Sequence, residues 1–291
     1  DHADDWRELM RLYMVRRTGS FIQDNYADTD PVNGRKFLTF EDGTRSYFPK
    51  RIPKTVKLTI DEHDAADQYA QLFAPAVVAS INALNLPRYG LGNYVAATPH
   101  SSPTAAEAKQ LQNLSRAGKR LMGFCRTNLF KRLESSGSAF QQSIERHVLR
   151  NYIFLHAIGK GLPLPLGTQD SGLLDAGNYD EDVDDETANP GLFDGDSDEI
   201  QKTPRALHLR TASDFENRAA EAYETYATQF KSRFMWLRPD LFVKSLAKDL
   251  ADDAASLLDV LTRCGDWNPA HDAKLDALHK LLTKRHPTEK I

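Results

Sequence analysis

The chain has 291 residues, of which 41% are hydrophobic and 27% charged, and its formal net charge is −4. This composition predicts a globular protein with a core of its own and argues against global disorder. No apolar run approaches the roughly 18–20 residues of a membrane-spanning helix, which excludes a transmembrane role. The first residues, DHADDWRELM, lack the basic and apolar regions of a signal peptide and are interpreted as the start of an internal piece of a longer chain.

The acidic residues are segregated from the basic ones. Residues 170–199 hold 12 Asp and Glu and no Lys or Arg, so the other 261 residues carry 37 basic and 29 acidic side chains, a net charge of +8. Residues 109–160 contain ten basic residues and only two acidic ones. Such a basic segment is typical of a surface that neutralises nucleic-acid phosphates, although helices also carry charge for solubility alone.

The N-terminal part reads as a helix over residues 3–26, followed by a β-hairpin closed on the Asp42-Gly43 turn. The next stretch, KTVKLTI, alternates apolar and polar residues and predicts a strand over 54–60. Asp61 is then expected to cap a helix that runs to about Asn85 and bends at Pro75.

Further helices are predicted at about 104–135, 138–159, 213–236, 240–264 and 271–285, and loops at 87–103 and 160–204. The fold class is therefore mainly α, a helical bundle or protrusion with a small β-hairpin or strand element near the N-terminus. Four segments are expected: 1–60, 61–160 as a basic helical insertion, 161–204 as an acidic, disordered or mobile loop, and 205–291 as a closing helical segment.

Motifs for a self-sufficient active site are absent from the sequence. GKGLP at Gly159–Pro163 lacks the hydroxyl residue and the preceding strand of a phosphate-binding loop. DGDSDE at Asp194–Glu199 does not place the residues of an EF-hand and is interpreted as a solvated, disordered acidic tether. Its complementary charge alone supports the further hypothesis that this loop covers the basic helices. Cys125 and Cys264 show no zinc-ligand spacing and are expected to be reduced, buried thiols of a cytoplasmic protein. No catalytic residue, metal ligand or cofactor is predicted in this chain, which is expected to be inactive as an ATPase.

Three segments, in this order, resemble Swi/Snf-class superfamily-two helicases: LMRLYMVRRTGSFI (Leu9–Ile22), FCRTNLFKRLESSGSAFQQSIERH (Phe124–His147) and DAKLDALHKLLTKRHPTEKI (Asp272–Ile291). The second segment is similar to a prokaryotic subgroup of this class. The first resembles the exit from the first RecA-like lobe and the third the opening of the second lobe. The resemblance implies a helical insertion between two motor lobes that contacts DNA. It also implies that the parent protein, and not this chain, binds ATP and Mg²⁺.

The candidate nucleic-acid contacts are basic or hydroxyl residues of the two central helices, because guanidinium, ammonium and hydroxyl groups donate to phosphates: Arg120, Arg126, Lys131, Arg132, Ser135, Ser136, Arg146 and Arg150. The alternative for Ser135 and Ser136 is that they end one helix and cap the next. Arg16 and Arg17 are assigned to the lobe junction, where they contact nucleic acid or pair with acidic residues.

The sequence thus predicts a non-catalytic inter-lobe region of an ATP-dependent DNA helicase or translocase, with DNA and the flanking RecA-like lobes as partners and no membrane association. The alternatives are a helical scaffold that binds a protein through the apolar faces of 104–159, without nucleic acid, and a nucleic-acid-binding module without a motor.

Overall fold

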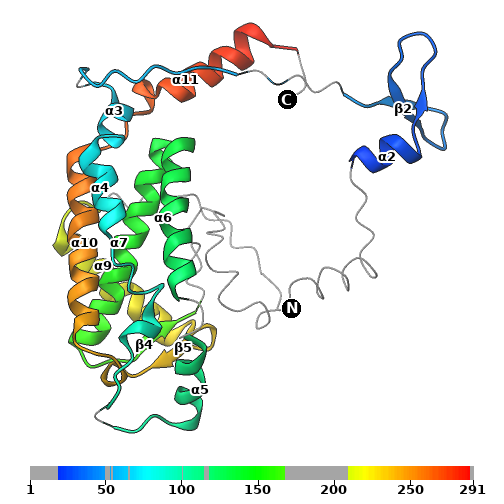
Figure 1. The fold of residues 1–291 in the computed structure, drawn as a ribbon. Coiled ribbons are helices and arrows are strands. Elements are labelled where there is room, and N and C mark those ends of the chain that lie inside the picture. Colours follow the sequence, from blue (N-terminus) through cyan, green and yellow to red (C-terminus); the bar gives the residue numbers. More distant parts are fainter. Residues whose placement is uncertain are drawn as a thin grey trace. The chain divides into compact units, whose positions relative to one another are not determined.

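The computed structural model describes residues 19–49, 53, 55–64, 66–99, 101–114, 118–167 and 209–288. The chain divides into two compact units at the junction between Lys57 and Leu58 (Figure 1). The fold is mainly helical with a small antiparallel sheet near the N-terminus, as the sequence predicts. The first boundary was expected at residue 60, and the segments expected at 61–160 and 205–291 supply helices to one and the same unit. Among the described residues, no helix has the length and apolar character needed to span a membrane.

The first unit is built on a short three-stranded antiparallel sheet. Its described elements are α2 (Gly19–Asn25), β1 (Asp28–Thr29), β2 (Lys36–Thr39) and β3 (Arg45–Tyr47). The predicted hairpin is confirmed, with Phe37 opposite Tyr47 in the register of β2 and β3. Gly43 supplies the left-handed turn conformation at φ +79°, and the Asp42 carboxylate accepts from the Thr44 N–H at 2.9 Å.

The second unit contains the other described elements. In chain order these are α3 (Gln68–Leu72), α4 (Pro75–Ala83), η1 (Leu91–Tyr94), α5 (Ala105–Leu114), α6 (Gly118–Ser135), α7 (Gly137–Gly159), β4 (Leu164–Leu166), α9 (Ala212–Thr228), η2 (Lys231–Arg233), β5 (Met235–Leu237), η3 (Pro239–Leu241), α10 (Ser245–Cys264), η4 (Pro269–His271), α11 (Ala273–Lys280) and the π-helical turn η5 (Leu281–Arg285). Strands β4 and β5 pair antiparallel.

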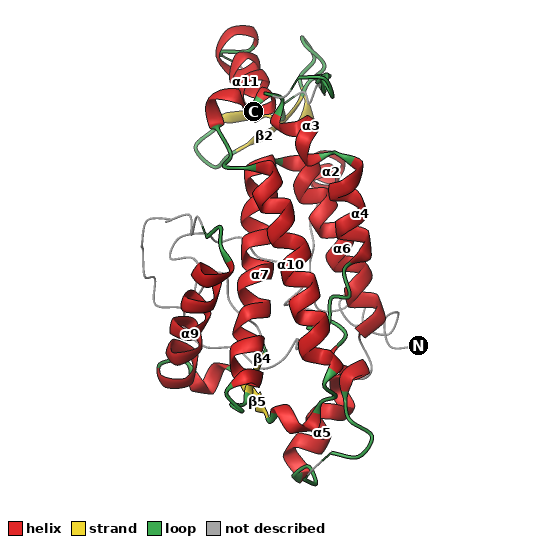
Figure 2. Cartoon of the chain, turned by 90° about the vertical axis from the view of Figure 1, so that its left-hand side faces the viewer, coloured by secondary structure: helices red, strands yellow, loops and turns green. Residues whose placement is uncertain are grey.

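Helix α7 is the centre of this unit. It contacts α6, α9 and α10, and Figure 2 shows α9 and α10 on either side of it. Phe140, Ile144 and Val148 on its predicted apolar stripe are fully buried. Because three helices surround α7, burial extends beyond that stripe to nearly every residue between positions 140 and 151.

The predicted strand over 54–60 is wrong, since its described residues have no regular secondary structure. The single helix predicted from Asp61 to Asn85 is also wrong. Asp67 caps α3 instead, accepting from the N–H groups of Tyr69 and Ala70. Pro75 begins α4 as its first residue, where a missing N–H costs no hydrogen bond, and does not bend a continuous helix.

Two further expectations are corrected by the pairing of β4 with β5. The helix predicted over 213–236 ends at Thr228, and Met235–Leu237 form a strand. Part of the loop predicted at 160–204 forms the partner strand, in which Leu164 lies opposite Leu237. The rest of that loop, from residue 168 onward, lies outside the described residues.

Candidate nucleic-acid interface

Helix α6 carries the charge that makes it the candidate interface. It has five basic residues, Lys119, Arg120, Arg126, Lys131 and Arg132, and one acidic residue, Glu134. Its buried side consists of Cys125, Leu129 and Leu133, which recur at helical spacing and pack into the core. The opposite side, away from α7, therefore faces solvent.

The solvent-facing side of α6 is centred on Lys131. Phe124, Thr127 and Ser135 share this side at spacings of three and four residues, and all are exposed. The Thr127 hydroxyl donates to the Gly123 carbonyl at 3.0 Å, so it is already engaged by its own helix. Among the described residues, no hydrogen bond or ion pair engages the Lys131 ammonium, which leaves its charge available to a ligand.

The other basic residues predicted to contact nucleic acid differ from Lys131 in their exposure or lie outside the described residues. Arg126 is half-buried, and its Nη2 donates to the Leu84 carbonyl, which ties α6 to the end of α4. Arg132 is also half-buried. Arg120 lies in α6, but its side chain, like residues Arg16 and Arg17 as a whole, lies outside what the structure describes.

Ser136 acts as a helix cap. Its backbone is extended at φ −153° and ψ 129°, and its hydroxyl accepts from the Ala139 N–H at 3.3 Å. This satisfies one of the N–H groups that the first turn of a helix leaves unpaired. The capping interpretation is thus confirmed for Ser136, while the neighbouring Ser135 is exposed at the end of α6.

Arg146 and Arg150 lie inside the bundle, with exposed fractions of 1% and 3%. A phosphate backbone outside the folded unit does not reach them, so the prediction that they contact nucleic acid is corrected by their burial. Both guanidinium groups act on buried His147, where desolvation first, and then the positive charges of Arg88, Arg150 and Arg146, hold the pKa well below its usual range.

A loop between α4 and η1 encloses His147. The Arg88 Nε donates to Asn151 Oδ1 at 3.0 Å, and the Asn151 amide donates to the Leu250 carbonyl at 3.4 Å. The His147 ring lies 5.8 Å from the ring of Tyr89, and its Nε2 is 3.6 Å from Cys125 Sγ. These contacts join the loop, α6, α7 and α10 through polar groups in the core.

Asp253 of α10 holds the same loop in a strained conformation. Leu86 has φ +51°, a left-handed conformation that costs a branched residue about 1–2 kcal/mol. The Asp253 carboxylate accepts from the N–H groups of Asn85 at 2.8 Å and Leu86 at 2.7 Å. Burial raises the pKa of Asp253, although these two backbone donors act in the opposite direction.

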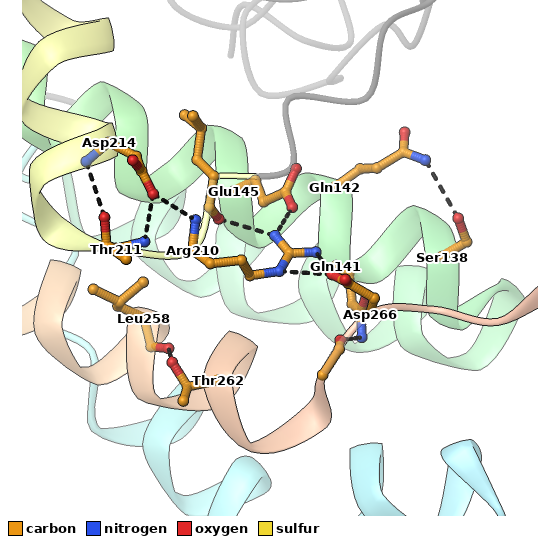
Figure 3. Close-up of polar contacts among 12 residues, drawn as sticks. Ser138, Gln141, Gln142, Glu145, Arg210, Thr211, Asp214, Leu258, Thr262 and Asp266 are labelled. Atoms are coloured by element: carbon orange, nitrogen blue, oxygen red, sulfur yellow. Dashed lines mark hydrogen bonds and ion pairs between the residues drawn. The ribbon is translucent and has the colours of Figure 1, made fainter.

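A second polar contact, which is only partly buried, lies where α9 begins. Figure 3 shows Arg210 between Glu145 of α7 and Asp266. The Arg210 Nη1 donates to the Glu145 carboxylate, and its Nε donates to Asp266 Oδ1 at 3.0 Å. The Gln141 amide donates to the Gly265 carbonyl at 3.0 Å beside them. Arg210 therefore fixes the start of α9 on α7 and on the chain after α10.

Sequence reasoning missed Arg88, Asn151, Asp253 and Arg210. Their partners lie 56 to 168 residues away, and no local pattern predicts such pairs. No group of three or more His, Cys, Asp or Glu side chains able to hold a metal ion occurs in the part of the chain that the structure describes. Comparisons with protein-family models, with curated proteins and with solved structures found no match.

Proposed function

We propose that this chain is a non-catalytic region of an ATP-dependent DNA translocase, and that it contacts the nucleic-acid backbone through the exposed side of α6. The observation that carries the DNA contact is the position of Lys131, which is exposed on a helix with five basic residues and one acidic residue. An ammonium on such a surface neutralises a phosphate and releases a counterion. The translocase part of the proposal rests on the three ordered segments that resemble Swi/Snf-class helicases.

The buried interior gives this surface a fixed shape. Leu129 and Leu133 anchor α6 in the core, and Arg126 ties it to the end of α4. A rigid helix presents Lys131 and Ser135 at a constant spacing, which favours repeated backbone contacts over a single flexible one.

The scaffold alternative has less support. Its partner would bind the apolar faces of 104–159, but Phe140, Ile144 and Leu133 are fully buried among the unit's own helices. A protein partner in this region would have to use other side chains.

Replacing Lys131 by Ala tests the proposal. We expect weaker binding of a fluorescein-labelled DNA duplex, and a slope of log affinity against log salt concentration that is smaller by about 1, because one phosphate contact is lost. The measurement is fluorescence anisotropy over a salt series that starts at about 50 mM.

Lys248→Ala is the matched control, because it removes the same charge from an exposed α10 lysine that is already paired with Asp252 at 2.8 Å. It is expected to leave the slope unchanged. Absence of DNA binding by the unaltered chain at the lowest salt concentration, or equal effects of the two variants, contradicts the proposed interface.

A further inference from the structure

A half-open cavity of about 220 Å³ lies in the second unit, and Glu134 of α6 is among the residues that line it. Its apolar walls come from Leu58 and Ile60 on one side and from Tyr69 and Phe73 of the α3 region on another. Ala273, the first residue of α11, completes the wall with a methyl group. The cavity therefore offers an apolar interior to a group that enters from outside.

Three polar side chains that line this cavity already have partners. The Tyr69 hydroxyl is 3.2 Å from Asp272 Oδ1, and burial raises the pKa of Tyr69 to about 12, so the phenol stays protonated. Lys274 donates to the Glu134 carbonyl and places its ammonium 4.6 Å from the centre of the Tyr69 ring. The Asp67 carboxylate is occupied by backbone N–H groups at the start of α3. The side chains of Tyr69, Lys274 and Asp67 therefore already have partners when a group enters.

The segment Leu58–Ile60 leaves its backbone open. No hydrogen bond between these three residues and any other described residue occurs, and Leu58 and Ile60 are 39% and 40% exposed. Leu, Thr and Ile at consecutive positions suit an extended chain, which is why the sequence predicts a strand here. A peptide that binds in an extended conformation pairs its backbone with open backbone groups and places side chains in apolar pockets, and both features occur here.

The rim of the cavity is acidic. Asp67 and Glu134 line it, and Asp61, Glu62 and Asp64 follow the open segment directly and are exposed. Among the described residues that line the cavity, Lys274 is the single cation, and its ammonium is held by the Glu134 carbonyl and the Tyr69 ring. This charge favours a basic partner over an acidic one.

We propose that this cavity binds an extended basic segment of a protein partner, which pairs its backbone with Leu58–Ile60 and inserts one aliphatic side chain between Ile60 and Phe73. Its lysine or arginine side chains lie against the carboxylates of the rim. This inference does not depend on the proposed contact with DNA.

The test uses the full 291-residue chain and two labelled peptides of equal charge. One alternates lysine with valine and leucine, and in the other serine replaces every apolar residue. We expect the apolar peptide to bind at least about tenfold more tightly, because only it fills the cavity. Fluorescence anisotropy gives both affinities, and hydrogen exchange is expected to slow at the amides of Leu58–Ile60 when the apolar peptide is present.

Ala273→Leu fills the cavity from the exposed start of α11 and is expected to weaken the apolar peptide by about tenfold. Ala106→Leu is the matched control, because it adds the same side chain to an exposed position of α5. Equal affinities for the two peptides, or equal affinities of the two variants, would show that the binding is only general attraction of lysine to acidic residues and would overturn the proposal. Unchanged exchange at Leu58–Ile60 would overturn the backbone pairing.

Discussion

His147 occupies a position in which a positive charge is strongly disfavoured. It is buried among Arg88, Arg146, Arg150 and Cys125, and its pKa lies well below the ordinary value of 6.5 because of burial first and the three guanidinium groups next. The folded protein therefore keeps this imidazole neutral at a pH at which the unfolded chain already binds a proton.

This difference predicts a loss of stability in mild acid. As the pH falls below about 6.5, the unfolded state takes up a proton that folded His147 does not, so the free energy of unfolding decreases, by up to about 1.4 kcal/mol per pH unit for this one group. The dependence is expected to continue down to the lowered pKa of the folded state. Urea unfolding between pH 7.5 and 5 measures it.

His147→Gln is expected to flatten this pH dependence, whatever its effect on stability at neutral pH. The control is His63→Gln, at an exposed position, which is expected to keep the slope of the unaltered protein. Equal slopes for the unaltered protein and His147→Gln would mean that the neutral buried imidazole does not cause the acid sensitivity.

At the scale of elements, the close approach of Trp267 determines how α7 begins. The Trp267 ring packs edge-on against Tyr69 with ring centroids 5.1 Å apart. It also covers Gly137 so closely that a β-carbon there would collide with it and with Leu72. Gly137 is thus required by packing against the chain after α10, and not by an unusual backbone angle.

Gly137→Ala is therefore expected to lower the free energy of unfolding by about 1–3 kcal/mol, because the added methyl forces the Trp267 ring or the start of α7 to move. Thermal or urea denaturation provides the measurement.

Gly123→Ala is the matched substitution, since a β-carbon at Gly123 in α6 meets no atom within 4 Å. There the better helix propensity of alanine is expected to raise stability by about 0.5–1 kcal/mol. If Gly137→Ala were as well tolerated as Gly123→Ala, the packing of Trp267 on α7 would be wrong.

On the scale of the whole molecule, the described residues form two units, and the larger one is organised around α7 and contains the α6 surface and the cavity beside Leu58.

The sequence contains no phosphate-binding loop. The string most similar to one, GKGLP, places Lys160 directly after α7, as the cap residue of that helix. We therefore expect the chain to hydrolyse no ATP, with or without DNA, in an assay of phosphate release. A turnover that disappears in Lys160→Ala would contradict this prediction and identify a phosphate site there.

The sequence by itself determined the local features of this protein. The Asp42-Gly43 turn and the Ser136 cap follow from side chains that bond to backbone groups two or three residues away, and the stripe of Phe140, Ile144 and Val148 follows from helix periodicity. Residues this close in the chain meet whatever the rest of the molecule does.

Only the tertiary structure decided what surrounds each element. Helical periodicity places Arg146 and Arg150 on the side of α7 opposite its apolar stripe. In the folded unit, α6, α9 and α10 enclose the helix and bury both side chains. The pairing of β4 with β5 and the contact of Arg210 with Glu145 join residues more than 60 positions apart. Their formation depends on how the helices pack together, and a short stretch of sequence does not predict that packing.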